Sequence, residues 1–395
     1  MKPTRTTKGM VAWLIMALSW VALSSVEAHA GTDHADVMNA FDVETPVRPM
    51  PVRTNGMVQI SYEVHLTSFS DEKLEITDVS LVNTADGGNL TSLSGDALVA
   101  VAHVVGETAA RKGGAVEVAP GQRVVLFLDV TVPAALHVES IRHRIGYRVQ
   151  GSLATHGFLS DAVAVSTSKP SLIGPPLSGG PWVAIHSPLW PRGHRRVFVA
   201  VAGHAKIPGR FAIDWVKVDE RGRTTKGDPD LAAQTYGYGD AVLAVDDAVV
   251  VAVRDGMDEP VHISQRTTHP LAEDAGNYLT LRLPDGRFAF YEHLKKGSIT
   301  VQSGDRVKKG QAMASLGFSG ESTGPHLHFH IADSNSPLDA EGLPFEIQSF
   351  QQEGRYEDVS RLGNPWTPPG PADAATLHNE WPAANVVVSF GSAAK

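Results

Sequence analysis

Residues 324–330 read Gly-Pro-His-Leu-His-Phe-His, and they carry the strongest signal in the chain. Alternate residues of a β-strand face the same side of a sheet. A strand here therefore places His326, His328 and His330 on one face, with the apolar Leu and Phe between them on the other. Three imidazoles on one face are costly when all are protonated. A metal ion or separate roles in proton transfer would relieve that cost, and a polar face with incidental histidines is the alternative.

Two other segments carry polar side chains in strand-like surroundings. Asp214 stands between Ile and Trp, where a carboxylate is costly unless it is paired or bound to a cation. An ion pair with Arg210 or Arg196 is the alternative. His293 follows the apolar strand of a hairpin that turns at Asp-Gly, residues 285–286. Taken alone, a single strand histidine indicates little.

Together these segments resemble the lysostaphin-type (LytM-like) zinc endopeptidases, which cut peptide cross-links in bacterial peptidoglycan. The run GNYLTLRLPDGRFAFYEHL resembles the family hairpin that ends in Tyr-x-His-Leu. The run VQSGDRVKKGQAMASLGFSGESTGPHLHFH resembles the stretch that follows it. The resemblance covers about residues 204–347. It implies a zinc (Zn2+) cofactor and a LytM-like antiparallel β-sheet of the duplicated hybrid motif type, with an open groove.

The resemblance also implies roles for four residues. His328 matches the zinc-binding second histidine of His-x-His, and Asp214 matches the zinc-binding aspartate of a His-x-x-x-Asp pattern. His326 and His293 match the two catalytic histidines. Zinc with three protein ligands keeps a position open for water. It lowers the pKa of that water to about 7 and polarises the scissile carbonyl.

The chain departs from the family pattern at one ligand position. Arg210 stands where the family has its first zinc-ligand histidine, and arginine stays protonated and cannot ligate zinc. His204 and His194 are available as replacements, and the sequence does not choose between them. His330 also departs, because the family usually carries an acidic residue there. We expect His330 and Arg210 to lie just behind the ligands, with His330 also open as an additional ligand.

The whole sequence predicts an all-β chain. Residues 31–165 contain short alternating segments between Gly, Asp and Asn clusters, which favours an immunoglobulin-like β-sandwich without helices. Residues 166–185 are rich in Ser, Gly and Pro and predict a linker that leaves the domains some freedom. Residues 186–347 are expected to form the LytM-like peptidase domain. Residues 348–395 are expected to be an irregular extension that covers it.

Residues 1–30 have the layout of a cleaved signal peptide. Three basic residues precede an apolar run over 11–23, and small residues stand at Ala28 and Ala30. The run is shorter than the roughly 20 residues of a membrane-spanning helix. We therefore expect no stable membrane anchor after cleavage and a periplasmic or secreted protein.

Composition narrows the possible chemistry. The 395 residues include no cysteine, which excludes disulfides, thiolate zinc sites and iron–sulfur clusters. A metal site must therefore use carboxylates and some of the 17 histidines. The 43 acidic and 34 basic residues leave a net charge of −9, which disfavours binding to nucleic acid.

Three functions fit these observations. The first is an exported zinc metalloendopeptidase that hydrolyses peptide cross-links of peptidoglycan, with a peptidoglycan peptide as its partner. Arg210 motivates the second, a catalytically degenerate LytM-like module that binds cell wall or activates an amidase. The third is a zinc endopeptidase of other exported peptides. In each case the N-terminal sandwich is expected to position the groove on the wall or on a cell-wall protein partner. Substrate specificity is expected in the loops 224–238 and 256–275.

Overall fold

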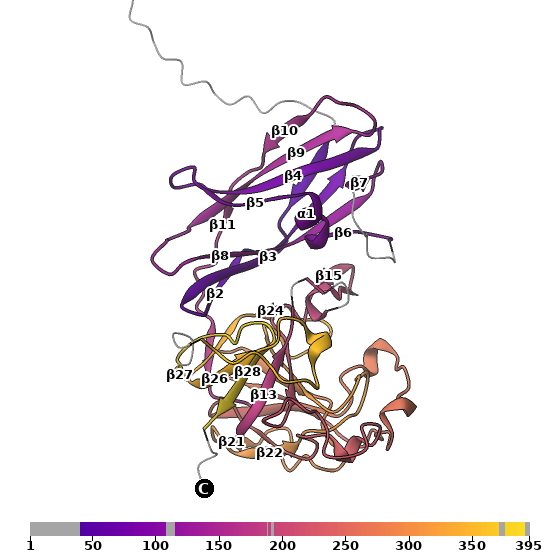
Figure 1. Cartoon of the computed structure of the whole chain (residues 1–395), viewed down its shortest axis with the longest axis vertical. Coiled ribbons are helices and arrows are strands. Elements are labelled where there is room, and N and C mark those ends of the chain that lie inside the picture. The colour runs from indigo at the N-terminus through magenta and orange to yellow at the C-terminus, as the bar shows by residue number, and fades with distance from the viewer. Residues whose placement is uncertain (1–39, 108–114, 188, 191–192, 371–375, 392–395) are drawn as a thin grey trace, which may run out of the picture. The chain divides into compact units, whose positions relative to one another are not determined.

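The structure is a computed structural model of the chain, shown in Figure 1. It describes residues 40–107, 115–187, 189–190, 193–370 and 376–391. The predicted signal peptide lies outside these ranges. Within them, no helix is both long enough and apolar enough to cross a membrane.

The N-terminal strands form two antiparallel sheets. One follows the order β1-β3-β8-β6 with β2 on β3, and the other follows β10-β9-β4-β5 with β7 on β4 and β11 on β9. The first sheet comprises β1 (Phe41–Glu44), β2 (Met50–Thr54), β3 (Met57–Ser68), β6 (Ala102–Val104) and β8 (Arg123–Pro133). The second comprises β4 (Leu74–Asn83), β5 (Asn89–Ser94), β7 (Val116–Val118), β9 (Ser140–Val149), β10 (His156–Leu159) and β11 (Val163–Ala164).

Alternation explains why these two sheets share one core. Inward residues of β3, such as Tyr62 and Val64, and of β4, such as Val79 and Leu81, are fully buried in the same hydrophobic cluster. The immunoglobulin-like topology stays a prediction. A short helix, α1 (Gly95–Val101), was not expected; it buries Leu and Val side chains but is too short to show a helical period in the sequence.

The C-terminal half is built on an 11-stranded sheet in the order β21-β18-β19-β20-β23-β16-β13-β28-β26-β27, with β24 on β23. Its members are β13 (Gly179–Ile185), β16 (Ile213–Lys217), β18 (Ala248–Arg254), β19 (Tyr278–Arg282), β20 (Phe288–Glu292), β21 (Arg306–Val307), β23 (Leu327–Ala332), β24 (Gly342–Leu343), β26 (Phe350–Arg355), β27 (Thr376–Leu377) and β28 (Val386–Phe390).

Three small pairs and five 3₁₀ turns complete this half. The pairs are β12 (Ser171–Ile173) with β25 (Phe345–Ile347), β14 (Val199–Val201) with β15 (His204–Lys206), and β17 (Ala241–Leu243) with β22 (Ala312–Ser315). The turns are η1 (His194–Arg196), η2 (Ala232–Gln234), η3 (Ile263–Gln265), η4 (Leu271–Glu273) and η5 (Val359–Arg361). The expectation of a chain built almost entirely of β-strands is confirmed for the described residues.

The linker predicted over 166–185 is wrong. β12 pairs with β25, and β13 lies inside the large sheet between β16 and β28, with Trp182 fully buried. The apolar Trp-Val-Ala-Ile run suits a central strand, and the Ser, Gly and Pro residues around it mark turns. The extension over 348–395 is also not irregular, because it supplies β26, β27 and β28 to the same sheet.

The freedom expected between the two halves is absent as well. Val52 of β2 belongs to the hydrophobic cluster of the C-terminal half, together with Trp182 and Phe345. The backbone amide of Trp381 donates to the carbonyl of Arg53. Residues 39–395 accordingly form one compact unit. A shared core cannot separate without exposing apolar surface to water.

Candidate metal centre

Strand pairing brings the first two candidate ligands together. β23 lies between β16 and β20, and the register sets Asp214 directly opposite His328. Nδ1 of His328 lies 2.9 Å from Oδ1 of Asp214. The apolar face of β23, including the fully buried Phe329, packs into the core and turns the histidines to the other face. The alternation predicted from sequence therefore produces this contact.

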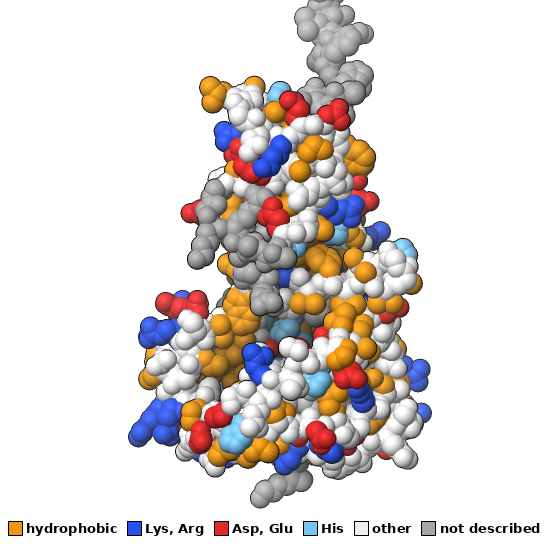
Figure 2. Space-filling view, turned by 90° about the vertical axis from the view of Figure 1, so that its right-hand side faces the viewer, with side chains coloured by type: hydrophobic (Ala, Val, Ile, Leu, Met, Phe, Trp, Pro, Cys, Tyr) orange, Lys and Arg blue, Asp and Glu red, His pale blue; other side chains and the backbone are white. Residues whose placement is uncertain are grey.

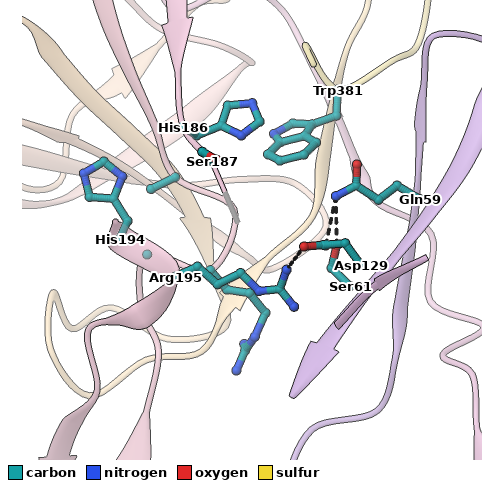
Figure 3. A pocket seen from close by; sticks show the side chains of 11 residues that line it. Gln59, Ser61, Asp129, His186, Ser187, His194, Arg195 and Trp381 are labelled. Carbon is teal, nitrogen blue, oxygen red and sulfur yellow. Dashed lines mark hydrogen bonds and ion pairs between the residues drawn. The ribbon is translucent and has the colours of Figure 1, made fainter. Parts of the chain in front are cut away.

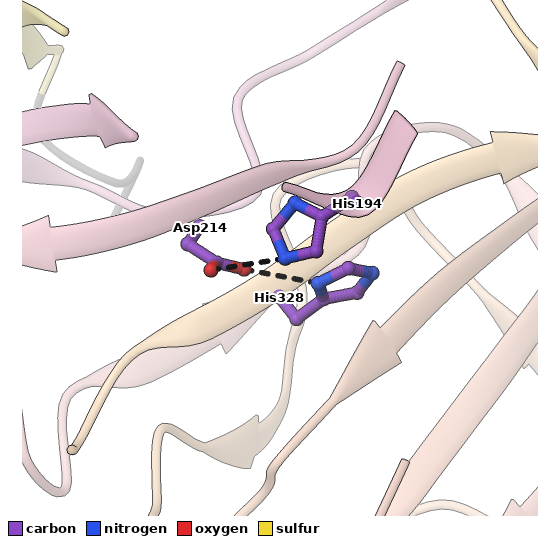
Figure 4. A group of neighbouring side chains, drawn as sticks. All are labelled: His194, Asp214 and His328. Carbon is purple, nitrogen blue, oxygen red and sulfur yellow. Dashed lines mark hydrogen bonds and ion pairs between the residues drawn. The ribbon is translucent and has the colours of Figure 1, made fainter. Parts of the chain in front are cut away.

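A third ligand reaches the pair from outside the strands. Nε2 of His194, the first residue of η1, lies 3.2 Å from Oδ2 of Asp214 (Figure 4). The three ligand atoms of His194, Asp214 and His328 lie within 4.8 Å of one another. Zinc bonds of about 2.0–2.2 Å in a tetrahedron place ligand atoms roughly 3.4 Å apart. Two imidazole nitrogens and a carboxylate at these separations fit a zinc ion.

Of the two replacements that the sequence offered, the structure brings only His194 to the cluster. His204 begins β15, where it pairs with Val201 of β14 and is exposed. The hairpin that holds it is short, so its turn does not reach the site. Their distances from Asp214 along the sequence could not show which of His194 and His204 is the ligand, because loops connect both to the strand of Asp214.

Arg210 does not lie behind the ligands as expected. Its guanidinium is buried and pairs with Glu63 at 2.9 Å and Glu341 at 2.8 Å, and it donates to the carbonyl of Gly342. Among the described residues, none of its recorded ion pairs or hydrogen bonds involves Asp214. Two carboxylates balance its charge, so it opposes a cation at the cluster less than an unpaired arginine would.

His293 and His326 lie next to each other beside the cluster, with ring centroids 4.7 Å apart. Nδ1 of His293 lies 2.8 Å from the carbonyl oxygen of Ser319, and Nδ1 of His326 lies 2.8 Å from that of Gly324. A carbonyl oxygen only accepts, so Nδ1 carries a proton in each ring. In a neutral His293 ring, Nε2 is then left with its lone pair. Nε2 of His326 is 3.2 Å from Oδ1 of Asp214, a carboxylate oxygen that also only accepts, so this nitrogen carries a proton too. Burial alone would lower the pKa of His326, but Asp214 raises it above its ordinary value.

His330 lies behind His328 and is not an additional ligand. Its Nδ1 is 3.2 Å from Nε2 of His328, on the side of that ring away from Asp214. Its ring stacks on Phe290 with a centroid distance of 4.7 Å. If Nδ1 of His328 binds a metal, Nε2 carries a proton and donates it to His330, which orients the ligand ring. The expectation that His330 lies just behind a ligand fits this geometry.

Sequence reasoning missed Glu292. It is buried on β20 directly opposite His328, and its carboxylate lies 4.0 Å from Nε2 of that histidine. Burial raises its pKa to about 8, and the negative charges of Asp214 and Asp274 add to this. Its place in the motif Tyr291-Glu292-His293 was the available signal. It stands at the variable position of Tyr-x-His-Leu, and the motif therefore implies no role for it.

Burial and charge together set the protonation of the site. Burial alone would raise the pKa of Asp214, but His194 and His326 hold that pKa well below its ordinary value. Burial lowers the pKa of His293 well below its ordinary value, and the nearby His326 lowers it further. His293 is therefore neutral at neutral pH. Burial also lowers the pKa of His328, and a neutral imidazole is the form that binds a metal.

A groove opens on this cluster. Asp214 and His326 lie in it, with hydrophobic side chains on its walls. Both loops expected to set specificity contribute to the groove, and so does η5 of the C-terminal extension. Its lining is Ile185, Trp190, Asp214, Val216, Thr224, Thr225, Pro229, Thr235, Ile263, Thr323, Gly324, Pro325, His326, Val359 and Leu362. Figure 2 shows a recess in this half of the molecule with histidine in it and a hydrophobic wall beside it.

Parts of the chain are similar to known proteins. The model of peptidase family M23 matches residues 230–340. The peptidoglycan DD-endopeptidases ShyB and ShyC of Vibrio cholerae serotype O1 are 44% identical over 72 residues and 43% identical over 56 residues. These matches cover 18% and 14% of this chain and only 16% and 12% of the two relatives. The catalytic domain of lysostaphin from Staphylococcus simulans is 20% identical, over 42% of this chain and 88% of that one, with a TM-score of 0.23.

The His and Asp cluster on the large sheet is a candidate metal centre, and the segment that matches the M23 model overlaps it. The part of the chain that is similar to peptidase family M23 spans residues 230–340. That segment contains His293, His326 and His328, whereas Asp214 and His194 lie before it.

Proposed function

We propose that the chain is an exported zinc metalloendopeptidase that hydrolyses peptide cross-links of bacterial peptidoglycan. The observation that carries this proposal is the convergence of His194, Asp214 and His328, which supplies three ligands although Arg210 replaces the usual histidine. The M23 match and the relatives named as peptidoglycan DD-endopeptidases support the substrate class. The signal-peptide layout of residues 1–30 supports a periplasmic or secreted location.

The residues around the cluster suit peptide hydrolysis. A zinc ion bound there would acidify a water molecule and polarise the scissile carbonyl. Neutral His293 presents an unprotonated Nε2, which can take a proton from the attacking water and later give it to the leaving amine. His326 can hydrogen-bond the same water or the oxygen that gains negative charge. The groove lined by Asp214 and His326 is where we propose that an extended peptide binds.

The first experiment measures zinc in the purified chain and release of peptide fragments from peptidoglycan. We expect about one zinc per chain and cleavage. His328→Ala should lose both, whereas the matched variant His293→Ala should keep zinc and lose about 10²- to 10⁴-fold in kcat. A chain without zinc at micromolar supply contradicts the proposal. That result would favour the degenerate module that binds cell wall or activates an amidase.

The N-terminal sandwich is proposed to bring the groove to the wall or to a cell-wall protein partner. It has no cluster of His, Asp and Glu with metal-binding spacing among its described residues. A pull-down of purified peptidoglycan with the intact chain, with and without a chelator, tests binding separately from cleavage.

A further inference from the structure

We infer that the N-terminal sandwich positions a zinc ligand of the peptidase half, because Glu63 and Asp129 fix the turn that presents His194. This inference rests on the proposed zinc site and adds a requirement to it. In most of the site, the strands of one sheet hold the ligands. His194 has no strand to hold it, since η1 is a single 3₁₀ turn.

The residue next to the ligand histidine anchors this turn. Arg195 is buried, and its guanidinium hydrogen-bonds to β3 and β8 of the sandwich. Nε donates to Glu63 at 3.0 Å, and Nη1 donates to Asp129. Nη2 donates to the carbonyls of Tyr62 at 2.9 Å and Leu128 at 2.8 Å. A planar guanidinium held by four acceptors on two strands has one orientation.

Two adjacent residues of the turn therefore face different halves of the molecule: His194 faces Asp214, and Arg195 faces the sandwich. Figure 3 shows His194 and Arg195 diverging, with Arg195 directed to Asp129 beside Ser61 and Gln59. The same cavity is lined by both halves of the chain. The anchored guanidinium limits how far the backbone of the turn, and with it the imidazole of His194, can move. A metal ligand tolerates only a few tenths of an ångström.

Glu63 also links the turn to the position of the missing ligand. Its two oxygens are divided between the two arginines: Oε1 accepts from Arg195 and Oε2 from Arg210 at 2.9 Å. Glu63 is 3% exposed, and the two arginine charges keep its pKa below the ordinary value despite its burial. One carboxylate thus neutralises the arginine that replaced the usual ligand and also holds the turn that supplies the new one.

Hydrophobic packing holds the segment after the turn on the same sheet. The guanidinium of Arg196 lies 4.9 Å from the ring centroid of Phe127, and Phe198 packs against that ring at 5.9 Å. Ile207 joins Phe127 in a small buried cluster. Residues 194–207 therefore rest on β8, whereas Asp214 and His328 rest on the sheet of the other half. The metal site is complete only when the two halves are docked.

The test is a double-mutant cycle on zinc affinity in the full-length chain. Zinc affinity is measured by competition with a chromophoric chelator for the wild type, Glu63→Gln, His194→Ala and the double variant. We expect Glu63→Gln to weaken zinc binding by about 10-fold or more, and His194→Ala to weaken it at least as much. In the His194→Ala background, Glu63→Gln should have no further effect, because it acts through the histidine.

A spectroscopic readout identifies the coordination itself. Cobalt(II) in place of zinc gives absorption bands that report the number of ligands. Glu63→Gln should shift these bands toward those of His194→Ala. Equal zinc affinity in Glu63→Gln and the wild type would overturn the inference. So would an equal loss in the presence and absence of His194, since that would show a general effect on the fold.

Two variants guard against unfolding, because Glu63→Gln leaves two buried arginines short of a partner. Asp129→Asn and Arg195→Lys each disturb the anchor while leaving the Glu63–Arg210 pair in place, and both should also weaken zinc binding. Glu75→Gln is the matched control: it breaks the Arg148 ion pair within the sandwich and should leave zinc affinity unchanged.

Failure of the inference can be told from failure of the proposed function. If the wild type binds zinc through His194 but Glu63→Gln, Asp129→Asn and Arg195→Lys all bind it equally well, only the inference fails. If the wild type binds no zinc, both fail. If zinc binding follows the cycle but peptidoglycan is not cleaved, the inference stands and the proposed substrate is wrong.

Discussion

At the scale of single residues, the site shows that a metal ligand is defined by where its donor atom lies. Arg210 holds the sequence position of a ligand and contributes an ion pair with Glu63 instead. His194 lies outside the His-x-x-x-Asp pattern of the family, yet its Nε2 lies 3.2 Å from the carboxylate of Asp214. With Arg210 at this position, His194, Asp214 and His328 still form a candidate three-ligand site.

This assignment predicts a clear contrast between the two candidate histidines. His194→Ala should lower zinc affinity at least 10-fold and reduce peptide hydrolysis with it, because one of three ligands is lost. His204→Ala should leave both unchanged, since His204 is exposed on β15. Zinc titration and hydrolysis of a cross-linked peptide measure the two effects. The reverse pattern would assign the ligand to His204.

At the scale of elements, the single strand β23 contributes residues both to the metal site and to the hydrophobic core. Its histidines lie on the face that carries the metal cluster. Its apolar residues, with Phe329 and Ile331 fully buried, pack into the core. The flanking strands β16 and β20 place Asp214 and Glu292 on either side of His328. A shift of β23 by one residue would exchange the two faces, so the core also fixes the register of the metal ligands.

This dual role predicts a large effect on stability from the buried face of β23. Phe329 packs against Tyr291 and Phe345 with ring centroids 5.1 Å and 5.3 Å away. Phe329→Ala should lower the free energy of unfolding by about 3–5 kcal/mol, because it leaves a cavity. The control Phe69→Ala, at a residue 67% exposed, should change it by less than about 0.5 kcal/mol. Urea denaturation followed by fluorescence measures both, and a loss below about 1 kcal/mol for Phe329→Ala would contradict this account.

At the scale of the whole molecule, the two halves share a core and a buried ion network. Val52 of the sandwich lies in the cluster of the other half, and Glu63 pairs with arginines that flank its site. We therefore expect the described residues to unfold in one cooperative step. Acid and metal removal act on this unit through different groups.

Acid should destabilise the chain partly through His143. Burial lowers its pKa to about 4, and its ring contacts the hydroxyl of Tyr62 at 2.9 Å. The unfolded chain takes up this proton near pH 6.5, before the folded chain does. The stability contributed by the neutral ring is therefore present above pH 6.5 and is lost as the pH falls toward 4, by about 3 kcal/mol.

The measurement is the free energy of unfolding between pH 7 and pH 4 for the wild type and His143→Gln. The variant should show a shallower decline over this range. His137→Gln serves as the control, because the side chain of His137 is 85% exposed, and it should follow the wild type. A decline of equal slope in all three proteins would show that other groups carry the acid sensitivity.

Metal removal should weaken the fold without abolishing it. The two hydrophobic cores do not include the ligand side chains, so a chelated chain should keep its far-UV circular dichroism at 25 °C. Zinc at about 1,000 times its Kd should add roughly 4 kcal/mol to the free energy of unfolding. Thermal melts with and without chelator measure the shift. Unfolding at 25 °C on chelation would show that the metal is required for folding.

Much of the site was predictable because it rests on local pattern. The alternation in 324–330 predicted one face of histidines, and His293, Asp214 and the strand character of their segments followed from short runs of sequence. The linker over 166–185 was misread because Gly and Pro mark turns between strands as well as flexible chain. Glu292 was missed because the strand that pairs with it, β23, comes much later in the sequence than the hairpin that carries Glu292.

The sequence by itself determined the strand period, the histidine motif of residues 324–330 and the absence of thiolate chemistry, since these depend on residue type and spacing within a few residues. Only the tertiary structure decided which histidine replaces the ligand lost at Arg210. That choice depends on Glu63, which lies more than a hundred positions before the site and acts through a buried contact with Arg195. A contact between such distant residues depends on how the sheets pack, and no local pattern encodes it.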